Sequence, residues 1–247
     1  FKLALFISFF PQIVQGPISR FGTLAEQLFR PNEFSYTRIK FGTQLILWGA
    51  FKKIVIADRA AILVDNAFGF PETFGGTYVA VAALVYAIQI YGDFSGYSDI
   101  AIGCSKLFGV RLMRNFAYPY FARDIAEFWR RWHISLTTWF RDYVYIPLGG
   151  SRVSKYKVLR NTLVIYVLSG LWHGPSWTYV TWGLLNAVLF FPSILTGKNR
   201  KYTGIIAEGK ALPTMKEFCQ MVWTFSLFAL GLVFFRSATI GDAVTYC

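Results

Sequence analysis

Long apolar runs divide this sequence and restrict the folds open to it. The clearest runs are 77–91, 158–172, 176–195 and 218–235, and a fifth run, 41–68, is interrupted by charged residues. A helix that spans the hydrocarbon core of a bilayer needs about 20 residues. Several of these runs are shorter, so the pattern predicts full spans together with tilted, broken or re-entrant helices.

The aromatic content also indicates a membrane protein. The chain of 247 residues carries 25 Phe, 14 Tyr and 8 Trp, while only 15% of its residues are charged. A soluble domain of this length rarely combines so many aromatic side chains with so few charges. We therefore predict an all-α fold, a polytopic transmembrane helix bundle with re-entrant or amphipathic helices.

The excess of positive charge has two interpretations. The net charge is +12, which in a soluble protein would suggest a nucleic-acid partner. Here many basic residues lie in loops between apolar runs, such as 151–160 and 198–201. Cytoplasmic loops of membrane proteins are rich in Lys and Arg, so we favour a topological origin and predict no nucleic-acid binding.

No internal repeat or low-complexity linker divides the chain, so we expect 1–247 to form a single membrane-embedded domain. Pro and Gly within 68–76 predict a turn between two helices. The chain starts inside an apolar stretch without an initiator Met and stops abruptly at Cys247, which suggests a fragment of a longer protein. The three cysteines show neither paired nor metal-ligand spacing, so no disulfide framework is predicted.

The segment from Asp124 to Ile146 alternates charged and aromatic residues. Its apolar positions recur at spacings of three and four, and they are Ile125, Phe128, Trp129, Trp132, Leu136, Trp139, Phe140 and Tyr143. This periodicity is typical of an amphipathic helix, which would lie in the interface or line a polar cavity in a bundle. We expect the helix to end at the Pro-Leu-Gly-Gly sequence 147–150.

His173 follows the apolar run 158–172 and precedes a Gly-Pro turn. If that run starts at the cytoplasmic boundary, its helix covers roughly 22 Å at 1.5 Å per residue. The hydrocarbon is about 30 Å thick, so the imidazole would lie within the membrane. An ionisable group at that depth usually faces a protein interior or a wet cavity. Neutral imidazole is a good general base, and a buried structural histidine is the alternative interpretation.

His133 lies one predicted helical turn after Trp129. It is either a second polar contact in the same cavity as His173 or a structural histidine at the edge of an aromatic face. Arg130, Arg131 and Arg141 could bind an anionic donor or lipid head groups through forked hydrogen bonds. They could equally anchor the helix at the membrane interface, which is the interpretation we favour.

Other chemistries have weaker support in the sequence. Asp93 and Asp99 follow the run 77–91, and we favour structural pairing of these carboxylates with arginines over a proton relay. The two histidines are 40 residues apart, and no HExxH or CxxC motif accompanies them, so no metal site is predicted. The absence of a G-x-S-x-G elbow, a Walker motif and a GxGxxG motif argues against serine hydrolysis and nucleotide-driven transport.

Two long stretches resemble the membrane-bound O-acyltransferase (MBOAT) family. They are FWRRWHISLTTWFRDYVYIPLGG (128–150) and NTLVIYVLSGLWHGPSWTYVTWG (161–183), and segments 9–20 and 91–103 extend the resemblance to most of the chain. The bacterial alginate O-acetyltransferase branch is the most similar, and it includes proteins of teichoic-acid D-alanylation and of peptidoglycan or cellulose acetylation. Family members are longer, so this chain resembles their central portion.

The resemblance implies a multi-helix membrane fold pierced by a funnel or tunnel, with His173 as the catalytic residue and His133 as a second motif residue. The implied reaction transfers an acyl group from a thioester donor, such as acetyl-CoA or an acyl carrier, to a hydroxyl, without a bound cofactor. His173 would act as general base on a hydroxyl of an extracytoplasmic polysaccharide. The candidate substrate-binding residues are Trp172, Trp129, Arg130 and Arg141.

Other functions remain open at this point. The protein could be an acyl-passing channel or transporter subunit, with a periplasmic or extracellular acyltransferase partner that performs the final transfer. A structural scaffold for a secretion complex is a third hypothesis. In every case we expect a multi-pass protein of the bacterial cell (inner) membrane, in contact with the lipid bilayer.

For the acyltransferase, the candidate oxyanion donors are the Trp172 indole, His133 and backbone N–H groups at Gly174.

Overall fold

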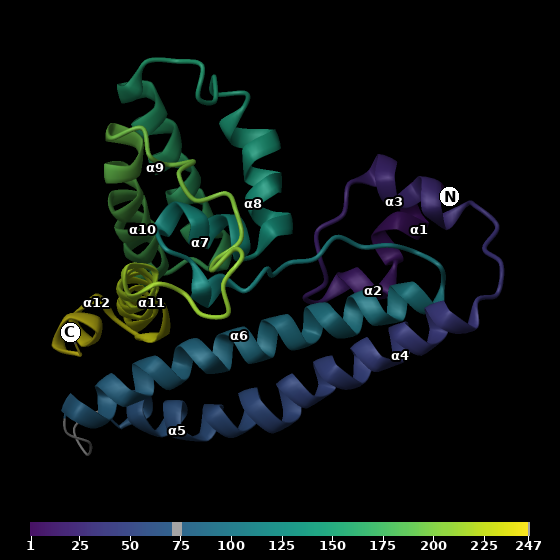
Figure 1. Cartoon of the computed structure of the whole chain (residues 1–247), viewed down its shortest axis with the longest axis horizontal. Helices are drawn as coiled ribbons and strands as arrows, with labels where there is room; N and C mark the ends of the chain where they lie inside the picture. Colours follow the sequence, from purple (N-terminus) through teal and green to yellow (C-terminus); the bar gives the residue numbers. More distant parts are fainter. Residues whose placement is uncertain (71–75, 247) are drawn as a thin grey trace. The chain divides into compact units, whose positions relative to one another are not determined.

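The computed structural model describes residues 1–70 and 76–246, and this part of the chain is helical and without strands (Figure 1). The all-α prediction is therefore confirmed. Residues 71–75, which belong to the predicted turn at 68–76, and Cys247 lie outside the described residues.

The chain divides into two compact units, each with its own packing. Unit 1 comprises Phe1–Val64, Val85–Phe116 and Ile134–Leu136, and unit 2 comprises Asp65–Leu84, Ala117–His133 and Thr137–Cys247. The prediction of a single domain over 1–247 stays a prediction.

Three short helices form the N-terminal part of unit 1. They are α1 (Lys2–Ser8), α2 (Phe10–Ile13) and α3 (Phe21–Leu28). Phe9, Leu24 and Val110 form the buried centre of this part. Full burial of such side chains contributes about 1.5–3 kcal/mol each, which holds these short helices in place.

The interrupted apolar run 41–68 is helical throughout. It forms α4 (Tyr36–Phe51), the π-helical η1 (Lys52–Ala57) and α5 (Asp58–Gly69). The next helix, α6 (Gly76–Leu107), continues beyond the apolar run 77–91 and through the polar stretch that follows it. Glycines allow α4 and α6 to approach closely, because a Cβ on Gly49 would lie 2.5 Å from the carbonyl oxygen of Gly96 (Figure 1).

Lysine–aspartate pairs connect η1 to α6 within unit 1. Lys52 Nζ lies 2.7 Å from Asp99 Oδ2, and Lys53 Nζ lies 2.5 Å from Asp93 Oδ1. Both carboxylates are thus paired, as predicted, but their partners are lysines of η1 rather than arginines. The lysines that interrupt the apolar run 41–68 therefore compensate the charges that follow the next apolar run in α6.

The single amphipathic helix expected between Asp124 and Ile146 is wrong, because the chain leaves the helix at Trp132, which is extended, and His133, which is left-handed. The segment forms α7 (Ile125–Arg131), α8 (Ile134–Phe140) and the π-helical η4 (Arg141–Tyr145). His133 has φ 43° and ψ 54°, a left-handed conformation that ends one helix and starts the next. Apolar spacing does not detect such a break, since two residues change the direction of the chain while both flanks keep their periodicity.

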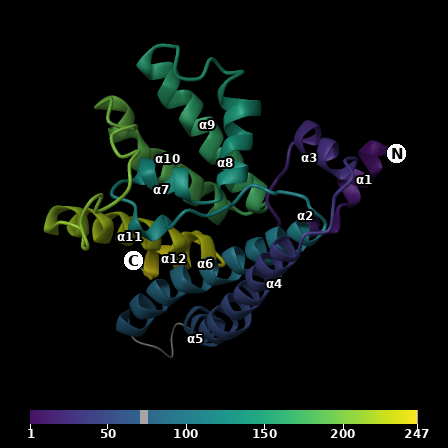
Figure 2. The same cartoon turned by 45° about the vertical axis from the view of Figure 1, so that its right-hand side comes forward.

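The C-terminal part of unit 2 contains α9 (Lys155–His173), α10 (Trp177–Leu195), α11 (Met215–Arg236) and the short α12 (Ile240–Thr245). Helix α10 packs against both α9 and α11, and α12 lies beside the end of α11 (Figure 2). Gly170 of α9 and Gly183 of α10 make the first contact close, because a Cβ on either would overlap a backbone carbonyl of the other helix.

Three helices are long and apolar enough to cross a membrane among the residues described. They are α6, α10 and α11, which contain the predicted runs 77–91, 176–195 and 218–235. The run 158–172 forms most of α9, which lacks this apolar character because basic residues occupy its first turns.

Candidate active site

His173 is the last residue of α9, and the chain turns sharply after it. Gly174 follows with φ 157°, a conformation that residues with side chains rarely adopt. A Cβ at this position would also lie 2.8 Å from the ring of Tyr179. The Ser176 side chain then accepts a hydrogen bond from the Thr178 N–H and caps α10. Glycine is thus required locally to place His173 at the end of the helix.

Aromatic rings surround the imidazole of His173. Its centroid lies 4.9 Å from that of Trp172, 5.3 Å from Trp182, 5.0 Å from Phe235 and 6.2 Å from Tyr179. Three of these four contacts bring residues of α10 and α11 to the end of α9. An aromatic environment solvates an imidazolium poorly, so it favours the neutral ring.

His133 lies in the same region of unit 2. Its side chain is 6% exposed, and its ring centroid lies 5.9 Å from that of Trp172. Trp172, which is 55% exposed, therefore contacts both histidines of the chain. His133 lies outside the three span-length helices, and burial lowers its pKa to about 3, with a further contribution from His173. The expectation that both histidines belong to one site is consistent with this arrangement.

Trp129 and Trp182 extend the aromatic surroundings of His173. Their ring centroids are 5.8 Å apart, and Trp129 also lies 5.5 Å from Tyr166. The indole Nε1 atoms of both tryptophans are buried and have no hydrogen-bond partner among the described residues. We call the four rings around His173, together with Trp129 and Tyr166, the aromatic cluster; its six members are Trp129, Tyr166, Trp172, Tyr179, Trp182 and Phe235.

Sequence reasoning selected Trp129 and Trp172 from this cluster and missed Trp182. A tryptophan inside a long apolar run is normally a packing residue, and nothing in the run 176–195 distinguishes Trp182 from its neighbours. The one available signal was its spacing of four from Asn186, a polar residue in the same run. Only the fold places that face of α10 beside His173.

Arg130 and Arg141 make contacts away from the aromatic cluster. Arg130 Nη1 donates to the Asn199 carbonyl oxygen at 2.7 Å, and its Nη2 donates to that of Tyr202 at 2.8 Å. Arg141 Nε donates to the neighbouring Asp142 Oδ1 at 2.8 Å. Arg130 thus holds the segment between α10 and α11, and a role of either arginine in substrate binding stays a prediction.

A buried carboxylate fixes the position of α7, which precedes His133. Glu127 is 1% exposed and accepts hydrogen bonds from Arg123 at 3.1 Å and from Arg131 at 2.6 Å. Arg123 also pairs with Glu217 of α11 at 3.2 Å. The sequence analysis had not identified this network. It supports the site by joining α7 to α11.

Comparison with known proteins agrees with the resemblance seen in the sequence. Residues 1–237 match the family model of MBOAT, the membrane-bound O-acyltransferase family. The chain therefore belongs to the membrane-bound O-acyltransferase family.

Individual relatives place it beside polysaccharide-modifying members. It is 38% identical over 245 residues to the peptidoglycan O-acetyltransferase of Helicobacter pylori, covering 98% of this chain and 45% of that protein. It is 40% identical over 240 residues to the "Probable alginate O-acetylase AlgI" of Pseudomonas aeruginosa, covering 96% of this chain and 43% of that protein. The teichoic acid D-alanyltransferase of Streptococcus thermophilus is 31% identical to this chain over 204 residues, covering 74% of this chain and 47% of that protein. The chain spans less than half the length of these relatives.

Proposed function

We propose that this chain carries the histidine site of a membrane O-acyltransferase. The enzyme moves an acyl group, acetyl in the simplest case, from a thioester donor to a hydroxyl of an extracytoplasmic polysaccharide such as alginate or peptidoglycan. The observation that supports this most directly is the placement of His173 at a helix end, inside the aromatic cluster and beside His133. The relatives named above act on polymers of this kind by their names.

In the proposed reaction, His173 acts as general base. A sugar hydroxyl is a poor nucleophile until its proton is removed, and a neutral imidazole can accept that proton as the oxygen attacks the acyl carbon. A carbon–oxygen bond forms, and the carbonyl electron pair moves to its oxygen. When this intermediate collapses, the carbon–sulfur bond breaks and the thiolate takes the proton from His173 to leave as a thiol.

The aromatic cluster suits this chemistry in two ways. Its rings favour the uncharged imidazole, which is the form that can accept a proton. They also limit the access of water, which would otherwise hydrolyse the thioester. His133 is held neutral by burial and contacts Trp172, as His173 does, so we assign it a positioning role.

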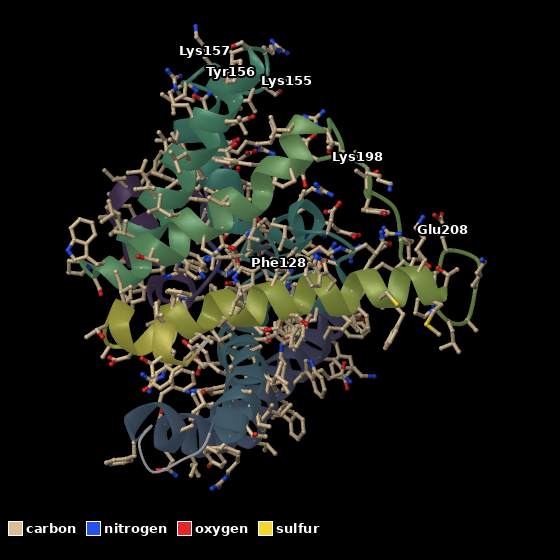
Figure 3. The ribbon with its side chains drawn as sticks, turned by 90° about the vertical axis from the view of Figure 1, so that its left-hand side faces the viewer. Phe128, Lys155, Tyr156, Lys157, Lys198 and Glu208 are labelled. Carbon is tan, nitrogen blue, oxygen red and sulfur yellow. The ribbon has the colours of Figure 1, made fainter. Side chains whose placement is uncertain are left out.

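The distribution of basic residues supports access to a cytoplasmic donor. Lys155 Nζ donates to the Leu195 carbonyl oxygen at 3.4 Å, so the start of α9 lies beside the end of α10. Figure 3 shows Lys155, Tyr156, Lys157 and Lys198 in this part of unit 2. Under the positive-inside rule this end is cytoplasmic, and His173, at the other end of α9, lies deeper in a bacterial inner membrane.

Substitution of His173 in the intact protein tests the proposal. In membranes supplied with labelled acetyl-CoA, His173→Ala should reduce acylated polymer by about 10²–10⁴-fold, the usual contribution of a general base. Membrane insertion should be normal, and Leu212→Ala, an exposed substitution in the segment before α11, should retain activity. Full product formation by His173→Ala would contradict the proposal and favour a scaffold.

The same experiment separates the enzyme from an acyl-passing subunit. Mass analysis of the cell polymers and of extracytoplasmic proteins shows where the label arrives. Label on the polymer in the absence of other proteins supports direct transfer. Label that accumulates on a periplasmic or extracellular protein would instead favour the passing role.

A further inference from the structure

The backbone of His133 has a conformation that its own side chain does not secure. With φ 43° and ψ 54° it is left-handed, which is uncommon for a residue with a side chain and persists where the surroundings fix it. His133 is the N-cap of α8, but its imidazole makes no capping hydrogen bond. The first N–H groups of α8 therefore need acceptors from another segment.

Asn115 supplies these acceptors from the segment that follows α6. The Ile134 N–H donates to the Asn115 carbonyl oxygen at 2.9 Å, and the Ser135 N–H donates to Asn115 Oδ1 at 3.3 Å. The Ser135 hydroxyl also donates to Oδ1, at 2.6 Å. Asn115 is 1% exposed and Ser135 is fully buried, so these hydrogen bonds are stronger than they would be in water.

The amide of Asn115 is itself held in place. Its Nδ2 donates to Ser98 Oγ of α6 at 3.0 Å, and Ser98 is also buried. The side chain thus uses its acceptor for α8 and its donor for α6, which fixes its orientation. Within unit 1, Asn115 therefore joins α6 to the first turn of α8.

A neighbouring residue holds the other side of the helix break. Within unit 2, the Ala117 N–H donates to the Arg131 carbonyl oxygen at 3.0 Å, and Arg131 Nη1 donates to the Ala117 carbonyl oxygen at 3.2 Å. The segment 115–117 therefore hydrogen-bonds to the last residue of α7 and to the first residues of α8. Both ends of the break at Trp132 and His133 are held by one short segment.

The direction of the His133 side chain depends on this break. A right-handed backbone here would continue α7 into α8 and turn the Cα–Cβ bond of His133 in another direction. In the observed conformation, its ring centroid lies 5.9 Å from that of Trp172, which is 4.9 Å from that of His173. The break thus places His133 against the residue that also contacts the proposed general base.

We propose that Asn115 is a positioning residue for acyl transfer: its side chain holds the first turn of α8 and thereby keeps His133 against Trp172. This inference rests on the proposed function, in which His133 has a positioning role. Asn115 acts only through His133, so its effect on acyl transfer should vanish when the imidazole is absent.

A matched pair of substitutions separates positioning from stability. Asn115→Leu removes the amide while keeping a side chain of similar size. Asn161→Leu in α9 is the control, because Asn161 is also buried and its Nδ2 donates to the carbonyl oxygens of Leu148 at 3.1 Å and Gly150 at 3.4 Å. Both variants lose a buried amide that secures a turn, but only Asn115 holds the residues that follow His133.

The first experiment is a double-mutant cycle in the intact protein, in membranes supplied with labelled acetyl-CoA. Asn115→Leu should lower kcat per folded molecule by about 10²-fold, a loss that a displacement of about 1 Å can cause, while KM changes far less. His133→Ala should also lower kcat, and adding Asn115→Leu to it should lower kcat no further. Asn161→Leu should lower the unfolding temperature without changing kcat per folded molecule.

An NMR measurement adds a readout that does not depend on turnover. In protein labelled with ¹³C-histidine, the Cε1–H signal of His133 is assigned by its disappearance in His133→Ala. Its chemical shift reports the neighbouring ring of Trp172. Asn115→Leu should move this signal, whereas Asn161→Leu should leave it in place.

The outcomes separate this inference from the proposed function. If Asn115→Leu leaves either kcat per folded molecule or the His133 signal unchanged, or lowers kcat equally with and without His133, the inference is overturned and the proposed function stands. If the unsubstituted protein transfers no acetyl group to any polymer, the proposed function fails and with it the role of Asn115 in acyl transfer. The NMR signal then still tests whether Asn115 holds His133.

A second variant decides if Asn115→Leu does not accumulate. Ser135→Ala removes one buried oxygen and the 2.6 Å hydrogen bond to Asn115, while the Ser135 N–H remains. A moved His133 signal and a lower kcat in Ser135→Ala support the inference. An unchanged signal overturns it.

Discussion

Two regions of this protein bury polar groups among apolar helices, and they treat them differently. In unit 1, Lys52 and Lys53 are paired with Asp99 and Asp93 at hydrogen-bond distance. In the aromatic cluster of unit 2, the indole donors of Trp129 and Trp182 have no partner within the described part of the chain. A polar group satisfied by its own protein contributes to folding, whereas a buried donor without a partner lowers stability.

The difference also reflects the chemistry of the groups. Two charged groups inside a membrane bundle must be paired, because an isolated charge there is costly. An indole N–H or a neutral imidazole is less costly to leave without a protein partner. A catalytic region in a membrane is therefore less costly to build from aromatic and imidazole groups than from charged groups. The lysine–aspartate pairs of unit 1 should respond to substitution through stability alone.

The largest expected effect on stability is at Glu127. Glu127→Gln removes the carboxylate that pairs with Arg131 and leaves Arg123 with Glu217 alone, in a buried position, which should lower the free energy of unfolding by about 3–5 kcal/mol. Denaturant titration of the intact protein in detergent measures this loss. Glu26→Gln, which removes an exposed partner of Arg30, should cost only about 0–1 kcal/mol. Equal losses for both variants would refute the structural role assigned to Glu127.

A smaller effect is expected in unit 1 from Asp99→Asn. Lys52 keeps its hydrogen bond to Ser95 but loses its ion pair, so we expect a loss of about 1–3 kcal/mol. Acyl transfer per folded molecule should be unchanged. The double variant Lys52→Met/Asp99→Leu, which removes both charges, should recover much of the stability. Loss of acyl transfer without unfolding would contradict a purely structural role for the Lys52–Asp99 pair, because it would show that this pair takes part in the reaction.

The smallest effect should follow Arg130→Ala. This substitution removes two hydrogen bonds to the segment between α10 and α11, so the cost should be about 1–2 kcal/mol at a partly exposed site. If Arg130 serves only that segment, KM for acetyl-CoA should stay within about twofold, since no substrate contact is lost. Arg141→Ala is the control, with an effect within about 0.5 kcal/mol. A large rise in KM for Arg130→Ala would favour substrate binding instead.

Most helices follow from residue patterns, and the exceptions have identifiable causes. The runs 176–195 and 218–235 correspond closely to α10 and α11, because long apolar sequences allow little else in a bilayer. The left-handed His133 could not be predicted, since a histidine at the centre of an amphipathic pattern normally continues the helix. The function of Arg130 was also open, because its partners are backbone carbonyls 69 and 72 residues away.

The sequence by itself determined the helical class, the membrane character and the family, and it pointed to the two histidines as candidates for the site. These properties depend on composition, periodicity and contiguous motifs, which are local. Only the tertiary structure decided which rings surround His173, that Trp182 joins them, and that its indole donor is buried without a partner among the described residues. Those facts depend on how α9, α10 and α11 pack, and packing is set by contacts between residues far apart in the chain.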